Sequence, residues 1–399
     1  MKEYLQTLNI PAQKELVSHL ISAGYAFAAW KMPDVPEIQM IVSLNPPKKI
    51  VKPALEELFS GFVINSYESN HPTGPYYIKA DLVFKGNVLT INPTVSDGEV
   101  DQFAKVLGGS ELPAKNDLQE KEAKRSKNDF SAGLAEAYIH KVAEAKRQIE
   151  KGILEKVVLS RYSEEALPKG FSIWEYFQKL CTQYPDAFCS LSSIPGRGVW
   201  IGASPELLIS DREGVFKTVS LAGTKKLKEG EALNNISWTQ KEIEEQAFVS
   251  RYIINCFKKL RLREFHEHGP KTVRAGKLAH LKTTFEVRYK EEAFEGLSSQ
   301  MATLLHPTSA VCGMPISEAK PWIQADEGYQ REFYSGFLGP VNYEQSTDLF
   351  VNLRCAKILG DRIRFYAGAG ITEDSIPEKE YEETEMKMDV LRQLVPSDR

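Results

Sequence analysis

Residues 364–388 read RFYAGAGITEDSIPEKEYEETEMKM, and the rest of the chain is organised around this stretch. Apolar residues alternate at its beginning, which predicts a strand. The alternation breaks at Gly368 and Gly370, which predicts a turn where backbone can approach a ligand closely. Ser375 and Pro377 are typical of a helix start, with serine as the cap and proline in the first turn. The stretch therefore predicts a strand, a ligand-facing turn and a helix.

The predicted helix is rich in carboxylates, which stand at Glu380, Glu382, Glu383 and Glu385. Carboxylates one turn away from backbone amides indicate a divalent hard cation beside a bound anion. The alternative is a solvated acidic helix start that the helix dipole favours. A second source of carboxylates elsewhere in the chain would favour the cation.

The longest predicted helix, residues 238–262, supplies that second source. Apolar residues at three- and four-residue steps give it one apolar stripe. Its first turns carry Glu242 and Glu245, which are three residues apart and share a helix face. At least one of these carboxylates can therefore point to the same place as a carboxylate of the predicted helix that carries Glu383.

Composition limits the class of protein. The chain has 399 residues, of which 42% are hydrophobic, so it can bury a large core. The net charge is −4 and the basic residues are spread out, which argues against a nucleic-acid partner. No apolar run approaches the ~20 residues of a membrane span, and the first residues lack the apolar core of a signal peptide. The five cysteines are scattered and form no Cys-x-x-Cys pair. We expect a cytoplasmic protein with reduced thiols and no membrane partner, and we leave its oligomeric state open.

The chain divides softly near residue 130. A polar segment rich in lysine and glutamate at 108–129 predicts a surface connection. Before it, the pattern predicts a helix at 13–23 and strands at 26–30, 39–42, 62–67, 76–84 and 88–91. We expect residues 1–130 to form a strand-rich part of the same fold as residues 131–399, which contain the candidate site.

Lys156 begins an apolar run, KVVLSR, that follows a predicted amphipathic helix at 131–151. If its side chain points into a cleft, burial would favour the neutral amine, which is a base at pH 7. The alternative is a strand-end lysine in water, which is the usual place for this residue.

Glu206 follows Pro205 within a run that predicts one strand from 199 to 209. Partial burial would let its carboxyl group hold a proton near neutral pH, as a general acid must. By contrast, His266 and His268 fall in a charged segment that predicts an exposed loop, and they have no partner at the spacing of zinc ligands.

Several short motifs in a fixed order complete the pattern. They are KVVLSR at 156–161, GASPELL at 202–208, LAGT at 221–224, HL at 280–281, HPT at 306–308 with Gly313 and Pro315, YSG at 334–336, LR at 353–354, AGAGI at 367–371 and ET at 383–384. Together, over about residues 135–394, they closely resemble the chorismate-utilising enzymes, which are the isochorismate, salicylate, anthranilate and aminodeoxychorismate synthases. Residues 1–130 match this family only in their strand-rich character.

The resemblance implies one large α/β (α+β) fold, in which two packed antiparallel sheets are surrounded by helices. It also implies a cleft that holds magnesium and chorismate. Glu245 and Glu383 would bind Mg²⁺, with Glu242 nearby. The substrate would be held by Thr224, His280, Gly368, Lys387 and Arg354, the last at the end of a predicted strand at 349–354.

The resemblance also indicates a reaction. Lys156 resembles the lysine that activates water for attack at C2 in isochorismate and salicylate synthases, and Glu206 resembles the acid that protonates the departing C4 hydroxyl. Ala310 occupies a place where isochorismate synthases tend to have alanine, whereas Tyr334 is similar to the tyrosine of salicylate synthases. We expect an isomerase, an isochorismate synthase that would serve menaquinone or siderophore biosynthesis. The alternatives are a salicylate synthase and, less favoured, a non-catalytic module that binds magnesium and carboxylates.

Overall fold

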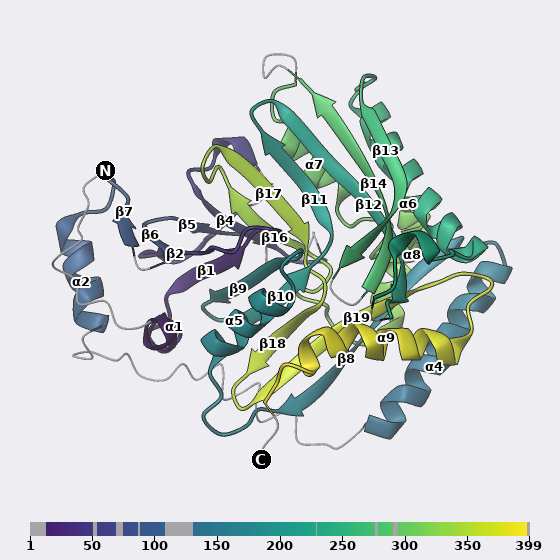
Figure 1. Cartoon of the computed structure of the whole chain (residues 1–399), viewed down its shortest axis with the longest axis horizontal. Coiled ribbons are helices and arrows are strands. Elements are labelled where there is room, and N and C mark those ends of the chain that lie inside the picture. The colour runs from purple at the N-terminus through teal and green to yellow at the C-terminus, as the bar shows by residue number, and fades with distance from the viewer. Residues whose placement is uncertain are drawn as a thin grey trace.

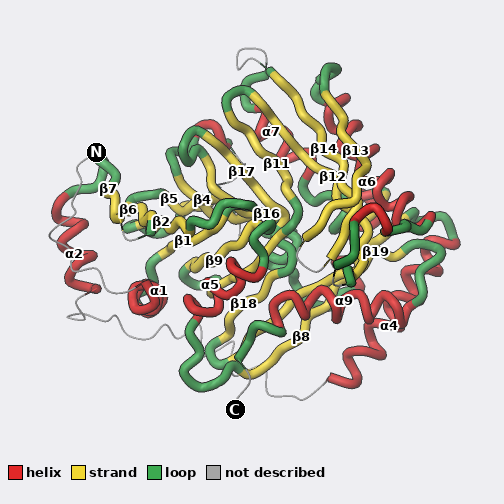
Figure 2. The backbone as a smooth tube through the Cα atoms, in the orientation of Figure 1, coloured by secondary structure: helices red, strands yellow, loops and turns green. Residues whose placement is uncertain are grey.

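Two large β-sheets face each other in the computed structural model, and the helices lie around them (Figures 1 and 2). All strand pairs found in the described part of the chain are antiparallel. The structure describes residues 13–50, 54–68, 75–86, 88–107, 131–228, 230–275, 278–289 and 294–396. The predicted α/β class with two packed antiparallel sheets is confirmed.

The first sheet has the strand order β15-β8-β19-β18-β10-β9-β1-β2-β6-β7. Its strands are β1 (Ala26–Lys31), β2 (Ile38–Ser43), β6 (Leu82–Lys85), β7 (Val88–Ile91), β8 (Lys156–Ala166), β9 (Phe188–Ile194), β10 (Gly198–Ser204), β15 (Gly313–Met314), β18 (Cys355–Leu359) and β19 (Arg362–Ile371).

The second sheet has the order β13-β14-β12-β11-β17-β16-β4-β5-β3. Its strands are β3 (Lys48–Lys49), β4 (Gly61–Asn65), β5 (Tyr76–Lys79), β11 (Leu207–Arg212), β12 (Val215–Lys226), β13 (His266–Ala275), β14 (Leu278–Arg288), β16 (Phe337–Val341) and β17 (Ser346–Val351). Strands from the first 107 residues therefore contribute to both sheets.

The helices form where the sequence has apolar stripes, and their apolar faces cover the outer faces of the sheets. Two of them, α6 and α9, meet at their first turns, where Lys241 contacts Glu380. The helices are α1 (Gln13–Ser22), α2 (Asp97–Leu107), α4 (Ser131–Glu150), α5 (Ile173–Gln183), α6 (Gln240–Lys259), α7 (Leu297–Leu305), α8 (Ile316–Asp326) and α9 (Pro377–Arg392), with short 3₁₀ turns η1 (Leu55–Glu57) and η2 (Leu233–Asn235).

Three clusters of buried apolar residues correspond to three layers. Aromatic side chains such as Trp30, Phe62 and Trp200 fill the space between the sheets, and the rings of Phe188 and Phe350 stack there at 4.1 Å. One outer cluster joins the first sheet to α1, α2, α5 and α9. The other joins the second sheet and parts of β8 and β19 to α4, α6, α7 and α8. The core thus fixes the position of both sheets relative to the helices that carry carboxylates.

Two predicted strands are each two strands in different sheets. The run 76–84 is interrupted at Ala80 and Asp81, where the chain passes from β5 to β6. The run 199–209 is interrupted at Pro205 and Glu206, between β10 and β11. Buried apolar residues stand on both sides of each break, so the pattern could not reveal the change of sheet.

The predicted turn at Gly368 and Gly370 is wrong. Both glycines lie inside β19, which stays paired with β8 through Ile371. The predicted cap is also wrong, since Ile376 is the N-cap of α9 and the Ser375 hydroxyl accepts a hydrogen bond from the Thr372 amide at 3.1 Å. Proline at the first position of this helix is confirmed.

Two further predictions need comment. His266 and His268 are exposed, as predicted, but they lie in β13 rather than in a loop because the segment pairs with β14. The predicted surface connection at 108–129 lies outside the described residues. Within the described part of the chain, no helix is long and apolar enough to span a membrane.

Candidate active site

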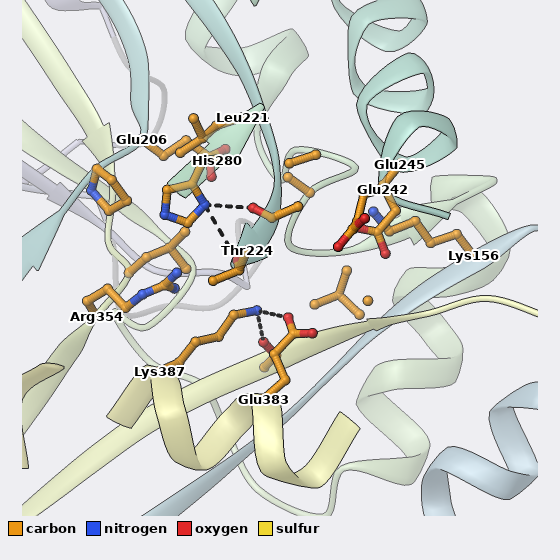
Figure 3. A pocket seen from close by; sticks show the side chains of 18 of the residues that line it. Lys156, Glu206, Leu221, Thr224, Glu242, Glu245, His280, Arg354, Glu383 and Lys387 are labelled. Atoms are coloured by element: carbon orange, nitrogen blue, oxygen red, sulfur yellow. Dashed lines mark hydrogen bonds and ion pairs between the residues drawn. The ribbon is translucent and has the colours of Figure 1, made fainter. Parts of the chain in front are cut away.

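One pocket brings together the candidate residues from distant parts of the chain (Figure 3). Every predicted site residue lines it except Tyr334. Its volume is about 130 Å³, and it is lined by Lys156, Val158, Pro205, Glu206, Leu221, Ala222, Gly223, Thr224, Lys241, Glu242, Glu245, His280, Ala310, Leu353, Arg354, Gly368, Gly370, Glu383 and Lys387.

The ends and irregularities of the elements supply these side chains. Lys156 is the first residue of β8, and Glu206 lies in the link between β10 and β11, where the chain crosses from one sheet to the other. Thr224 lies within a shift in the register between β12 and β14, opposite His280, where the ladder is interrupted. Polar groups are thus placed where regular pairing stops, so they remain available to a ligand.

Glu206 is almost fully buried, with 4% of its surface exposed. Burial raises the pKa of Glu206 to about 7, although Arg354, Lys156 and Lys387 act in the opposite direction. Its carboxyl group can therefore hold a proton near neutral pH. That state is the one a general acid needs.

Lys156 is 3% exposed and lies against Gly370 and Glu245. A Cβ atom added at Gly370 would meet Lys156 Cε at 3.0 Å and Glu245 Oε1 at 3.1 Å. Glycine near the end of β19 is therefore what lets the lysine and this carboxylate reach the pocket side by side. In Figure 3, Lys156 lies beside Glu242 and Glu245, on the opposite side of the view from Glu206 and His280.

Two carboxylates face the pocket from the starts of two helices, Glu245 from α6 and Glu383 from α9. Burial raises the pKa of Glu245, and the like charge of Glu383 raises it further. Lys156 and Lys241 act to lower it but do not outweigh burial. Burial acts in the same way on Glu383, but the neighbouring cations, first Lys387, outweigh it and hold the pKa of Glu383 below its usual range.

The donor set fits a hard divalent cation. Glu245 and Glu383 offer oxygen ligands that repel each other, and a cation between them would relieve that repulsion. Among the described residues, no group of three or more His, Cys, Asp or Glu side chains is arranged to hold a metal ion. Binding through one or two carboxylates, with water and substrate completing the shell, is the usual mode for Mg²⁺.

Glu242 caps the N-terminus of α6. Its Oε2 accepts hydrogen bonds from the Thr239 amide at 2.5 Å and the Thr239 hydroxyl at 2.7 Å, which caps α6, and it lies 3.5 Å from Lys225 Nζ. The capping interaction fixes the helix start from which Glu245 projects. A place for Glu242 near the metal stays a prediction.

His280 is neutral, and its tautomer follows from its hydrogen bonds. Burial, with a contribution from Arg354, lowers the pKa of His280 to about 3. Nδ1 lies 2.7 Å from the Gly223 carbonyl oxygen, which can only accept, so Nδ1 carries the proton. Nε2 is consequently an acceptor, and it is buried without a partner among the described residues. This nitrogen can accept a hydrogen bond from a ligand hydroxyl.

Arg354 presents its guanidinium to the pocket from the connection between β17 and β18, not from the predicted strand, because β17 ends at Val351. Its backbone is left-handed, with φ of 47°. A residue other than glycine in this conformation is often found at a functional site, where the surrounding structure holds it. The planar donor group is suited to a carboxylate.

Lys387 donates to the Gly368 carbonyl at 2.8 Å and pairs with Glu383 Oε1 at 2.6 Å. Ala310 also faces the pocket. Tyr334 lies just outside, buried, with its hydroxyl oxygen 2.9 Å from where a Cβ at Gly368 would be. It stacks on Tyr366 at 5.4 Å, so its ring belongs to the core between the sheets.

The sequence did not reveal Lys241, which lines the pocket, and it placed Glu380 among the carboxylates of the helix without assigning it a role. Lys241 Nζ lies 2.5 Å from Glu380 Oε1. A signal for Glu380 was present, because Glu380 and Glu383 have the same three-residue spacing as Glu242 and Glu245. Glu385, by contrast, pairs with Arg161 and Arg392, outside the pocket lining.

The family model of the chorismate-binding enzymes matches residues 83–395. The chain belongs to the chorismate-binding enzyme family. Isochorismate synthase EntC of Escherichia coli K12 is 30% identical over 244 residues, 60% of this chain and 61% of that protein. The salicylate biosynthesis isochorismate synthase of Pseudomonas aeruginosa is 31% identical over 284 residues, 68% of this chain and 57% of that protein. The chain thus spans about three fifths of the length of these relatives.

A solved structure has the same fold over almost the whole chain. MenF, the menaquinone-specific isochorismate synthase of Escherichia coli, superposes with a TM-score of 0.74. The alignment covers 98% of this chain and 92% of MenF at 20% sequence identity. The architecture described above is therefore that of the chorismate-utilising enzymes.

Proposed function

We propose that this protein is an isochorismate synthase, an isomerase that converts chorismate to isochorismate by adding water at C2 and expelling the C4 hydroxyl. The observation that carries the proposal is the presence of Lys156 and Glu206 in one pocket, where burial raises the pKa of Glu206 to about 7. A reaction that adds one hydroxyl and expels another needs a base and an acid at the same pH. The relatives named as isochorismate synthases support this assignment.

Each residue then has a defined task. Lys156 takes a proton from the attacking water, and Glu206 gives a proton to the departing C4 oxygen. Arg354 and Lys387 bind the substrate carboxylates, and the free Nε2 of His280 accepts a hydrogen bond from a hydroxyl group of the substrate.

Mg²⁺ is proposed as the cofactor, held by Glu245 and Glu383, and when bound it would neutralise the charge of the substrate carboxylate and orient it. Glu245 and Glu383 themselves fix that point in the pocket, because each projects from the first turns of a helix anchored in the core. Isochorismate made here would enter menaquinone or siderophore biosynthesis.

The second candidate is a salicylate synthase, which would also eliminate pyruvate. Tyr334 favours it by resemblance, whereas Ala310 lines the pocket and offers no hydroxyl that could hold the side chain to be eliminated. Incubation with chorismate and MgCl₂, followed by chromatography for isochorismate, salicylate and pyruvate, tests both candidates. We expect isochorismate with little pyruvate. Stoichiometric salicylate and pyruvate would favour the second candidate, and absence of any turnover would leave the non-catalytic module.

A further inference from the structure

An ion pair joins the two helix starts that carry the pocket carboxylates. Lys241 in the first turn of α6 contacts Glu380 in the first turn of α9, with Nζ 2.5 Å from Oε1. The side chains are 24% and 4% exposed, so the pair is shielded from water. Lys241 lines the pocket and precedes Glu245 by four residues, one turn of the same helix.

The ammonium of Lys241 serves more than one carboxylate. Burial acts to lower the pKa of Lys241, but Glu380, Glu245 and Glu383 together raise it above its ordinary value. The second oxygen of Glu380, Oε2, is buried and has no hydrogen-bond partner among the described residues. A buried carboxylate with one unsatisfied oxygen is costly, and it would be costlier still without its ionic partner. A cation that takes the place of the ammonium must therefore itself bind near Glu380.

We propose that Lys241 is the resident counter-ion of Glu245, Glu380 and Glu383, and that Mg²⁺ binds by displacing its ammonium from Glu380. The inference deepens the proposed function, since it rests on the metal assigned to this site. In this arrangement Lys241 keeps the acidic helix starts together before the metal arrives. Glu380 then exchanges one positive partner for another.

If Mg²⁺ displaces Lys241, the lysine has two effects of opposite sign, one on the stability of the fold and one on metal binding. Without metal, Lys241 stabilises the fold because it compensates three buried or partly buried carboxylates. With metal, its charge repels the incoming cation, and the ion pair must break before Glu380 is free. A lysine whose ammonium lay too far from the metal to compete with it would have the first effect without the second.

The test compares Lys241→Met with the wild-type protein, using MgCl₂ alone as the probe. We expect the melting temperature of the variant to be lower without Mg²⁺ and to rise more than that of the wild type when Mg²⁺ is added. Calorimetric titration with MgCl₂ should show that the affinity for Mg²⁺ is higher in the variant by about tenfold or more, because one competing unit charge is gone.

Three further variants make the test specific. Lys241→Arg keeps the charge and should bind Mg²⁺ as the wild type does. Lys241→Gln removes the charge but keeps a hydrogen-bond donor for Glu380. It replaces Lys241→Met if that protein does not fold. Lys225→Met removes a lysine that lies 3.5 Å from Glu242 at the rim, and it should change the affinity much less. Equal or weaker Mg²⁺ binding in both uncharged Lys241 variants, or no Mg²⁺ binding by the wild type, would overturn the proposal.

The metal-binding test and the test of the proposed isomerase activity can give different results. Metal affinities that follow the expected order, in a protein that does not convert chorismate, would support the displacement and reject the isomerase. Conversion of chorismate with unchanged affinities in the variants would do the reverse.

Discussion

Replacement of Glu206 by glutamine should make the protein more stable at alkaline pH while it loses activity. Glutamine keeps the size and the hydrogen-bonding capacity of the protonated acid but cannot ionise. Folding raises the pKa of Glu206 from 4.5 to about 7 because the side chain is buried. The folded state therefore binds this proton more tightly than the unfolded state does, and ionisation costs stability as the pH rises from 4.5 to 7.

The magnitude follows from the shift. A difference of one pKa unit is worth about 1.4 kcal/mol, so the change from 4.5 to about 7 corresponds to about 3 kcal/mol at pH 8. The wild type carries this cost at pH 8 and is almost free of it below the unfolded pKa. Glu206→Gln should consequently match the wild type near pH 4.5 and exceed its free energy of unfolding by up to about 3 kcal/mol at pH 8.

Urea unfolding of both proteins at a series of pH values between 4.5 and 8 measures this difference directly. Glu318→Gln, at an exposed position in α8, is the control and should stay within about 0.5 kcal/mol of the wild type throughout. Turnover of chorismate should fall roughly 10²- to 10⁴-fold in Glu206→Gln because the proton donor is gone. A variant that is no more stable than the wild type at pH 8 would refute the argument from burial.

Three other changes test the remaining parts of the pocket. Lys156→Ala should lower turnover by roughly 10²-fold or more while chorismate still binds in a calorimetric titration, because Arg354 remains to hold a carboxylate; turnover close to that of the wild type would show that the base lies elsewhere. Glu245→Gln or Glu383→Gln should abolish Mg²⁺-dependent turnover, and full activity of either variant in EDTA would contradict the metal assignment. Gly370→Ala should displace Lys156, whose Cε would lie 3.0 Å from the added methyl group, so turnover should fall although circular dichroism stays unchanged.

Periodicity in the sequence predicted the helices well and the strands less well. Helix α6 was expected at 238–262 and runs from Gln240 to Lys259, because an apolar stripe over twenty residues is difficult to mistake. The change of sheet at Pro205 and the glycines inside β19 were missed. A strand that crosses between two buried sheets has apolar neighbours throughout, and a glycine needed for close approach looks the same in a sequence as a glycine needed for a turn.

The candidate site was largely predicted because short motifs along the chain resemble those of the chorismate-utilising enzymes. Lys156, Glu206, Glu245 and Glu383 do line one pocket. The ion pair of Lys241 with Glu380 was not predicted, because it depends on how α6 and α9 approach each other and not on any spacing within one helix. The role of His280 was not predicted either. Its Nε2 is identified as the acceptor only because the structure shows that Nδ1 donates to the Gly223 carbonyl oxygen.

The pairing of early and late strands has a consequence for synthesis on the ribosome. Strand β1 pairs with β9, where Phe27 is opposite Ser193, and β4 pairs with β16, where Asn65 is opposite Phe337. The emerging N-terminal strands must therefore wait for partners that are translated much later, with their edges open to other chains in the meantime. Chaperone binding to the nascent chain should accordingly persist until β9 and β16 have left the exit tunnel.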